Sequence, residues 1–236
     1  MVERGTMLVA VSACHGRHAL TRSWAEHTKS LGFDLIVLSI TKDEENRPLL
    51  SLAKTGALLP VLMPNDPLSG KFNAAMRYAM ELGATRIMIL PSDDFASPAW
   101  VMAARESEED YMYPHTLATV DSETQATYKI TKLSFGTLKY GAGRVVSRRV
   151  IEKLGGRLWP ENLNRGLDGA SHAAITRAGF PVKVVETEGI PITDVKTKEN
   201  LWPFQTWQTS GRPCTIDEAL HMCSPSVRAQ IDALKQ

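Results

Sequence analysis

Two adjacent carboxylates, Asp93 and Asp94, follow an apolar segment in the stretch RIMILPSDDF. Unpaired carboxylates are costly to bury, so this pair must meet water, a cation or the start of a helix. A hard divalent cation prefers carboxylate oxygens, and Mg²⁺ typically joins one or two carboxylates to substrate phosphates. Such a cation would neutralise a departing diphosphate. The structural alternative is that Ser92 or Asp93 caps the helix that follows.

The residues before this pair alternate between apolar strands and helices. We expect strands at residues 7–13, 34–40, 58–63 and 86–90, and helices at 17–31, 47–56 and 69–82. Uniformly apolar strands separated by helices are typical of a parallel sheet that is covered on both faces. Right-handed crossovers place the carboxyl ends of all four strands at one edge, where ligands bind in such sheets. The pair is therefore predicted to lie at a ligand-binding edge.

After Asp94 the pattern changes. We expect helices at residues 97–106, 147–154 and 167–178, a strand at 182–186, and two helices at the end of the chain. Residues 111–140 are rich in Tyr, Thr, Val and Ile, which favours short, partly antiparallel strands. Residues 189–211 are predicted to be irregular.

Composition and charge limit the classes of protein to which this chain can belong. The 236 residues are 43% hydrophobic and 22% charged, which is typical of a folded α/β protein with a sizeable core. A net charge of +1 provides no general attraction to nucleic acid. Three cysteines form no disulfide framework, the first apolar run is too short for a signal peptide, and no stretch is long enough to span a membrane. We expect a cytoplasmic protein.

The strand ending in Asp-Asp, preceded by GKFNAAMRYAMELGA, resembles the GT-A glycosyltransferases, especially family two. In that family a strand ends in an Asp-x-Asp or x-Asp-Asp signature. The resemblance implies a GT-A-like (Rossmann-like) α/β fold: a mostly parallel sheet with helices on both faces, and a smaller antiparallel part in the second half. It implies a single domain, residues 1–236, with a nucleotide-sugar-binding half (1–95) and an acceptor half with a C-terminal loop and helices (96–236). The sequence departs from the family where Pro91 replaces a common aspartate and SACHGRHALTRSW replaces a Pro-x-Tyr/Phe-Asn opening.

The resemblance also implies residues for the metal and the donor. Asp94 would be the firmer ligand of Mn²⁺ or Mg²⁺, and Asp93 its neighbour, facing the metal or the ribose. Ser12, Ala13 and Asp43 would lie near the nucleotide base, and Lys71 would lie beside the diphosphate or the base.

The acceptor side of this family often has a Gly-rich turn, a helix, and an acidic residue that opens another helix. GAGRVVSRRVIEKLGG followed by NRGLDGASHAAI matches that order. An inverting transferase needs one general base for the acceptor hydroxyl, and Asp168 is the candidate. The alternative is that Asp168 merely caps its helix. His172, on the same helical face, could orient Asp168, contact the acceptor, or lie on the surface.

The second half also carries an arginine run, Arg144, Arg148, Arg149 and Arg157. These side chains could bind phosphate or acidic groups of an acceptor. A solvated helix face is the favoured interpretation for most of them.

The tail ITDVKTKENLWPFQTWQ combines aromatic and charged residues. Lys196 would suit a diphosphate, and Trp202 a sugar ring or a stacked base in the acceptor. GT-A enzymes often close such a loop over the donor, sometimes with a third metal ligand, for which Asp194 and His221 are candidates. The alternative is that the tryptophans of the tail pack on the core.

The function implied is metal-dependent transfer of a sugar from a nucleoside diphosphate sugar, first of all a UDP-sugar, to an acceptor hydroxyl. The acceptor would be a glycan or a modified DNA base. Two alternatives remain: a nucleotidyltransferase of the same fold, and a non-catalytic binding module. The sequence has no Walker or dinucleotide motif and no nucleophile elbow. Cys214, His221 and Cys223 match no tetrahedral metal pattern.

Overall fold

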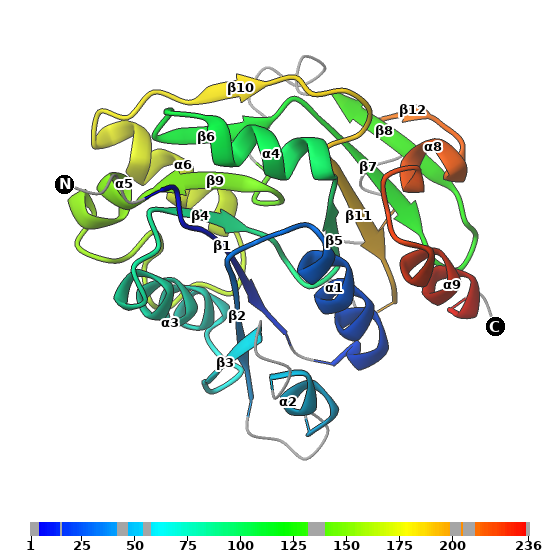
Figure 1. Ribbon diagram of the computed structural model, residues 1–236, viewed down its shortest axis with the longest axis horizontal. Helices are drawn as coiled ribbons and strands as arrows, with labels where there is room; N and C mark the ends of the chain where they lie inside the picture. The colour runs from blue at the N-terminus through cyan, green and yellow to red at the C-terminus, as the bar shows by residue number, and fades with distance from the viewer. Residues whose placement is uncertain are drawn as a thin grey trace.

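The computed structural model describes residues 5–14, 16–41, 47–53, 58–131, 140–198, 204 and 211–234 (Figure 1). Its first part contains β1 (Leu8–Ala13), α1 (His18–Ser30), β2 (Leu35–Ile40), α2 (Arg47–Ala53), β3 (Leu58–Leu62), α3 (Leu68–Glu81) and β4 (Arg86–Ile89). The remainder contains β5 (Asp94–Ala96), α4 (Pro98–Glu106), β6 (Tyr111–Pro114), β7 (Thr116–Asp121), β8 (Thr127–Thr131), β9 (Arg144–Ser147), α5 (Arg148–Lys153), α6 (Leu167–Arg177), β10 (Lys183–Val185), β11 (Ile192–Lys196), β12 (Arg212–Pro213), α8 (Ile216–Leu220) and α9 (Pro225–Ala233).

The larger sheet has seven strands in the order β10-β6-β9-β4-β1-β2-β3. The four expected strands β1 to β4 are parallel to one another, which confirms the prediction. The chain runs outward from β1 to β2 and β3, and then crosses back so that β4 lies on the other side of β1. The carboxyl ends of β1 and β4 therefore flank a topological switch point, where ligands bind in open α/β sheets.

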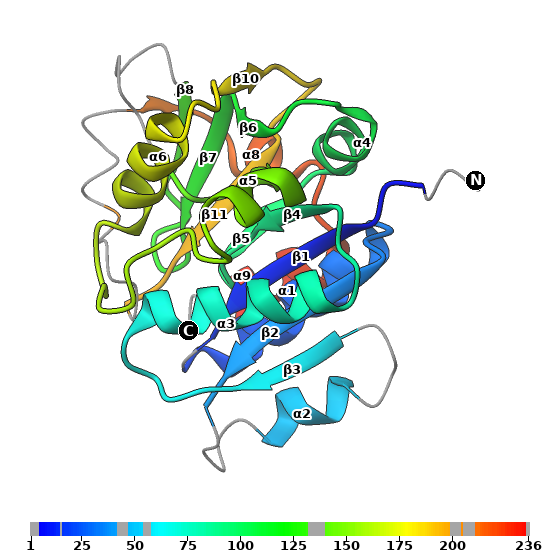
Figure 2. The ribbon, with the colours of Figure 1, turned by 90° about the vertical axis from the view of Figure 1, so that its left-hand side faces the viewer.

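Helices cover both faces of this sheet, with α3 on one side and α1 on the other (Figure 2). The alternation of side chains along β1 explains this arrangement. Leu8 and Ala10 belong to one buried cluster with Trp24 of α1. Val11 belongs to the other, with Phe72 of α3. Helix α1 also packs against α9 at the end of the chain (Figure 1).

The second sheet has five strands in the order β12-β8-β7-β11-β5, and three of them, β5, β11 and β12, were not expected. Strand β11 lies in a segment predicted to be irregular, and that prediction was wrong. Its five residues are all buried, yet Thr193, Asp194 and Lys196 are polar, so no apolar pattern marks the strand. Strand β5 has only three residues, too few for a periodic signal.

Strand β9 was also missed, because the Gly-rich sequence before it predicts a turn leading directly into a helix. It lies between β4 and β6 and is antiparallel to both. The mixed sheets agree with the expected fold class, a mostly parallel sheet followed by a partly antiparallel region.

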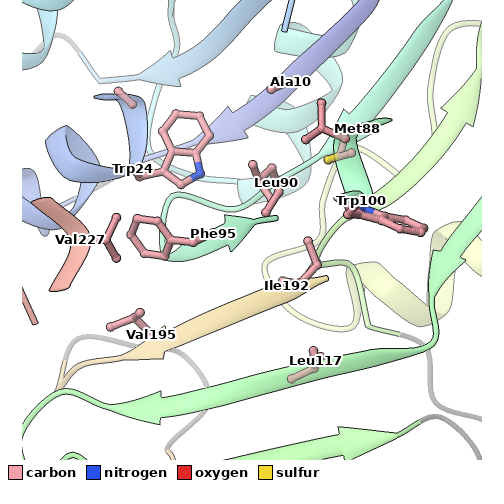
Figure 3. Close-up of a cluster of buried hydrophobic side chains, with 14 of the residues drawn as sticks. Ala10, Trp24, Met88, Leu90, Phe95, Trp100, Leu117, Ile192, Val195 and Val227 are labelled. Atoms are coloured by element: carbon pink, nitrogen blue, oxygen red, sulfur yellow. The ribbon is translucent and has the colours of Figure 1, made fainter. Parts of the chain in front are cut away.

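The space between the two sheets is filled by one apolar core (Figure 3). Phe95 of β5 is 1% exposed, and Trp24 of α1 and Val227 of α9 gather around it. Trp100 of α4 is fully buried, and its indole Nε1 donates to the Gly143 carbonyl at 2.8 Å. Within the described ranges, no helix is both long and apolar enough to cross a membrane.

Asn73 of α3 ties the first sheet to the loop before α6. Its amide Nδ2 donates to the Trp159 carbonyl at 2.9 Å, and its Oδ1 accepts from the Leu158 N–H at 3.2 Å. The side chain is fully buried, so neither bond can be replaced by water. The asparagine of the GKFNAAM motif therefore has a structural contact in this chain.

We expect Asn73→Ala to lower the free energy of unfolding by roughly 2–3 kcal/mol, because it leaves two buried backbone groups unsatisfied. Urea denaturation followed by circular dichroism measures the loss. Arg77→Ala, at an exposed position of the same helix, is the matched control and should change stability by less than about 0.5 kcal/mol. Equal effects of the two variants would contradict this prediction.

Candidate functional site

The Asp93–Asp94 pair lies where the chain passes from one sheet to the other. After β4, a turn closes with the Asp94 N–H donating to the Pro91 carbonyl at 2.9 Å, and Asp94 then begins β5. Both side chains are buried. Neither Ser92 nor Asp93 caps the next helix, because the Ser97 hydroxyl accepts the Trp100 N–H at 3.1 Å. The capping interpretation of the pair is therefore wrong.

An ion pair joins the two strand ends across the switch point. The Arg17 guanidinium Nη1 lies 2.7 Å from Asp93 Oδ2, and both side chains are largely buried. Arg17 is the residue before α1 and has φ of 48°, which is unusual for a residue other than glycine. Backbone strain of this kind concentrates at functional sites. Sequence reasoning gave Arg17 no role, although its position after β1 was a usable signal.

Strand β11 brings two more charges to the pair. Asp94 is the register partner of Asp194 in the antiparallel β5–β11 ladder. Lys196 Nζ lies 2.7 Å from Asp194 Oδ2, whereas Asp194 Oδ1 is buried with no hydrogen-bond partner among the described residues. Burial raises the pKa of Asp94 well above its usual value, and the nearby Asp194 and Asp93 carboxylates raise it further.

Asp93, Asp94 and Asp194 are the side chains at this junction that could hold a divalent cation. Within the described part of the chain, no three His, Cys, Asp or Glu side chains form a ready metal cluster. Arg17 pairs with Asp93 and Lys196 pairs with Asp194, whereas Asp94 has no side-chain hydrogen bond or ion pair to a described residue. A free carboxylate beside an unsatisfied Asp194 oxygen fits a hard cation that completes its shell with phosphate oxygens.

Asp168 reaches the same region from α6. The N-cap of this helix is Gly166, without a side-chain cap, so the capping interpretation of Asp168 is wrong. Asp168 Oδ1 instead lies 3.2 Å from the Arg144 Nη2 atom. The surrounding protein raises the pKa of Asp168 by removing hydration, and Arg144, the Gly141 N–H and Lys196 oppose that rise. Asp168 in turn raises the pKa of Asp94, so the two carboxylates share one electrostatic environment.

Arg144 is fully buried, contrary to the expectation of a solvated face. It belongs to β9 rather than to a helix, and its guanidinium lies over the Tyr113 ring, 5.3 Å from the centroid. Arg148, Arg149 and Arg157 have 41, 73 and 56% exposed side chains, as predicted for the run. The sequence contained no signal to separate Arg144 from them.

The remaining predicted residues are distributed as follows. Ser12 and Ala13 lie buried at the carboxyl end of β1, next to the switch point. Lys71 of α3 is 1% exposed, and its ammonium donates to the Cys14 carbonyl in the loop after β1. Asp43 and Trp202 lie outside the described residues.

His172 and His221, two further candidates, have separate surroundings. His172 Nδ1 lies 3.2 Å from the Tyr111 hydroxyl, and the ring packs on Tyr111 and Tyr113 rather than hydrogen-bonding to Asp168. His221 follows α8 and is exposed, whereas Asp194 lies beside Asp94. Of the two candidates for a third metal ligand, Asp194 is the one next to the pair.

Neither a protein-family model nor a curated protein matches this chain by sequence. Among solved structures, it is similar to the mannosyltransferase PcManGT from Pyrobaculum calidifontis in complex with GDP-Man and Mn²⁺. The TM-score is 0.57 at 13% identity, covering 98% of this chain and 74% of that one. It is also similar to the inositol-1-phosphate CTP transferase from T. maritima, with a TM-score of 0.52 at 13% identity over 93% of this chain and 98% of that chain. The fold is GT-A-like.

The raised pKa of Asp94 gives a stability prediction with a definite sign. Above that pKa the folded protein holds a costly charge, and near the ordinary value of 3.8 the cost disappears. In EDTA-treated buffer at pH 8, Asp94→Asn should therefore melt higher than the wild type, by about 2–4 °C per kcal/mol of relief. The gap should shrink as the pH falls toward that ordinary value.

Differential scanning fluorimetry across this pH range measures the gap. Glu26→Gln, at an exposed acid on α1, is the control and should show no pH-dependent gap. A melting temperature for Asp94→Asn below that of the wild type at pH 8 would refute the assignment of a destabilising charge.

Proposed function

We propose that this protein is a metal-dependent glycosyltransferase that uses a nucleoside diphosphate sugar. The observation that carries the proposal is the gathering of Asp93, Asp94, Asp194 and Asp168 in one charged environment beside the β1–β4 switch point. The similarity of the fold to a mannosyltransferase solved with GDP-Man and Mn²⁺ supports the same choice. Acids gathered at the ligand-binding edge of an open α/β sheet suit a cation and a diphosphate.

In this proposal Asp94, with Asp93 and Asp194 beside it, holds Mn²⁺ or Mg²⁺ together with the donor diphosphate. The cation when bound supplies Lewis-acid stabilisation of the leaving group. Residues 1–95 bind the base and ribose, through Ser12, Ala13 and Asp43, with Lys71 near the diphosphate. Lys196 adds positive charge from β11 on the same side.

Asp168 acts as the general base on the acceptor side. It accepts the proton of the acceptor hydroxyl while that oxygen bonds to the anomeric carbon. The bond from the anomeric carbon to the diphosphate breaks, and the nucleoside diphosphate leaves. The configuration at the anomeric carbon of the transferred sugar is inverted. A general base must be within reach of the acceptor hydroxyl. The Asp168 side chain is 48% exposed, so an acceptor can approach it. His172 and Trp202 would lie on the acceptor side, toward a glycan or a modified DNA base.

A nucleotidyltransferase is the second candidate, because the fold is also similar to a CTP transferase. A donor panel separates the two. Nucleoside diphosphate released from a nucleotide-sugar supports sugar transfer, whereas pyrophosphate released from a nucleoside triphosphate supports the alternative. Neither product, with Mn²⁺ or Mg²⁺ present, would favour a non-catalytic binding module.

Asp94→Ala should lower the release of nucleoside diphosphate by at least roughly a hundredfold, because Lewis-acid stabilisation is worth several kcal/mol. A coupled assay for nucleoside diphosphate measures the rate. Chelation should stop the wild-type reaction, and added Mn²⁺ should restore the wild type but not the variant. Near-normal turnover by a folded Asp94→Ala variant would end the metal assignment.

Asp168→Asn should lower transfer by about 10²- to 10⁴-fold, the usual contribution of a general base. Donor binding, measured by calorimetry in the presence of metal, should stay close to that of the wild type. If donor affinity and transfer fall together, Asp168 shapes the fold of the site rather than taking a proton.

A further inference from the structure

Arg144 has a buried guanidinium that contacts both α6 and the Tyr113 ring of β6. Its side chain is 0% exposed, and it donates through Nη1 to the Ser171 hydroxyl and through Nη2 to Asp168. Burial of an arginine is costly unless its donors are used by partners of fixed geometry. Here Nη1 and Nη2 have such partners, whereas Nε has none among the described residues. The two acceptors belong to the same helix, α6, so one guanidinium holds the first two turns of that helix against β9.

We propose that Arg144 and the backbone of Gly141 form a clamp that holds the Asp168 carboxylate in position toward the acceptor hydroxyl. The proposal rests on the function proposed above, in which Asp168 is the base. Arg144 is a positioning residue, since it acts through Asp168 and is itself shielded from solvent. We call Gly141 and Arg144 together the carboxylate clamp.

The Gly141 side of the clamp is a steric requirement. A Cβ atom at position 141 would lie 2.2 Å from Asp168 Oδ1 and 3.1 Å from its Cγ, well inside contact distance. Any side chain there must push the carboxylate away. Gly143 is held equally closely, with φ of 70° and with Ile192 of β11 2.4 Å from where its Cβ would be. The GAG turn is therefore closely packed at both glycines, against Asp168 at Gly141 and against Ile192 at Gly143.

Aromatic side chains of β6 pack against the guanidinium of Arg144. It lies over the Tyr113 ring, and the Tyr111 and Tyr113 hydroxyls are 2.7 Å apart. Tyr111 in turn contacts His172 of α6 at 3.2 Å. A planar cation stacked on a ring and bonded on two sides has little rotational freedom. The orientation of Asp168 is thus set by packing that extends through β6.

The charges around Asp168 determine how the pH dependence of kcat/KM responds when Arg144 is replaced. They are Arg144 from β9, Lys196 from β11, Asp94 from β5, and Tyr111 and Tyr113 from β6. Of these, Arg144 does most to lower the pKa of Asp168. Removing its charge should raise that pKa and move the acidic limb of the kcat/KM profile to higher pH. Simple loss of packing would lower the rate without moving that limb.

Gly141→Ala is the sharpest test, because it displaces the carboxylate without removing a charge. We expect kcat to fall by about a hundredfold, the cost of misplacing a reacting group, while the donor KM stays within about threefold. Gly169→Ala, one residue beyond Asp168 with nothing within 4 Å of the added Cβ, is the matched control and should keep wild-type kinetics. Wild-type kcat for Gly141→Ala, or a loss carried by the donor KM, would overturn the proposal.

Arg144→Lys and Arg144→Met test the other side. Lysine keeps the charge but cannot bond Ser171 and Asp168 with one planar group, so kcat should fall by about tenfold with the acidic limb unmoved. Methionine should lower kcat further and shift the acidic limb to higher pH. Unmoved limbs in both variants, at equal loss of kcat, would mean a structural role only. Should either variant fail to fold, the Gly141→Ala result decides.

Asp168→Asn separates failure of the clamp from failure of the proposed function. If Asp168→Asn retains transfer, the assignment of the base is wrong. If it stops transfer while Gly141→Ala and Arg144→Lys behave like the wild type, Asp168 is the base and the clamp alone is refuted.

Discussion

The whole site depends on the cost of keeping several carboxylates out of bulk water. Asp93, Asp94 and Asp194 are all buried within one electrostatic environment, where each raises the cost of charging its neighbours. Arg17 forms an ion pair with Asp93, and Lys196 forms one with Asp194. Asp94 has no ion-pair partner among the described residues. Such an imbalance destabilises the folded protein, and in the function proposed above a bound cation would relieve it.

The junction between the two sheets creates this concentration of charge. The chain leaves the larger sheet at the end of β4 and enters the smaller one at Asp94, where it pairs with Asp194. Phe95, directly after Asp94, anchors the junction because it is buried in the core that both sheets share. On the opposite side, the GAG turn brings Arg144 and Asp168 to the same region. Charged groups are therefore placed by strands, a tight turn and the start of α6 rather than by long loops.

Some of this arrangement was predictable from local patterns. The apolar run before Asp93 and Asp94 is a strong strand signal, and parallel strands bring their carboxyl ends to one edge whatever the details of the side chains. The proximity of Asp168 followed from a resemblance in the order of motifs. The ion pair of Arg17 with Asp93 and the strand containing Asp194 were not predicted as such, because no local pattern marks a polar strand that is buried by its neighbours.

By itself, the sequence determined the alternation of β1 to β4 with their helices and the position of the Asp93–Asp94 pair at the end of β4. Local hydrophobic periodicity suffices for these, since it depends on neighbours along the chain. Only the tertiary structure decided which charges face each other. Asp194 and Asp94 are about a hundred residues apart in the chain and become neighbours because β11 pairs with β5 in this register. Arg144 contacts Asp168, and the carboxylate fits there because Gly141 has no side chain. Such pairings depend on register and close packing, which are properties of the assembled sheets and not of any single segment.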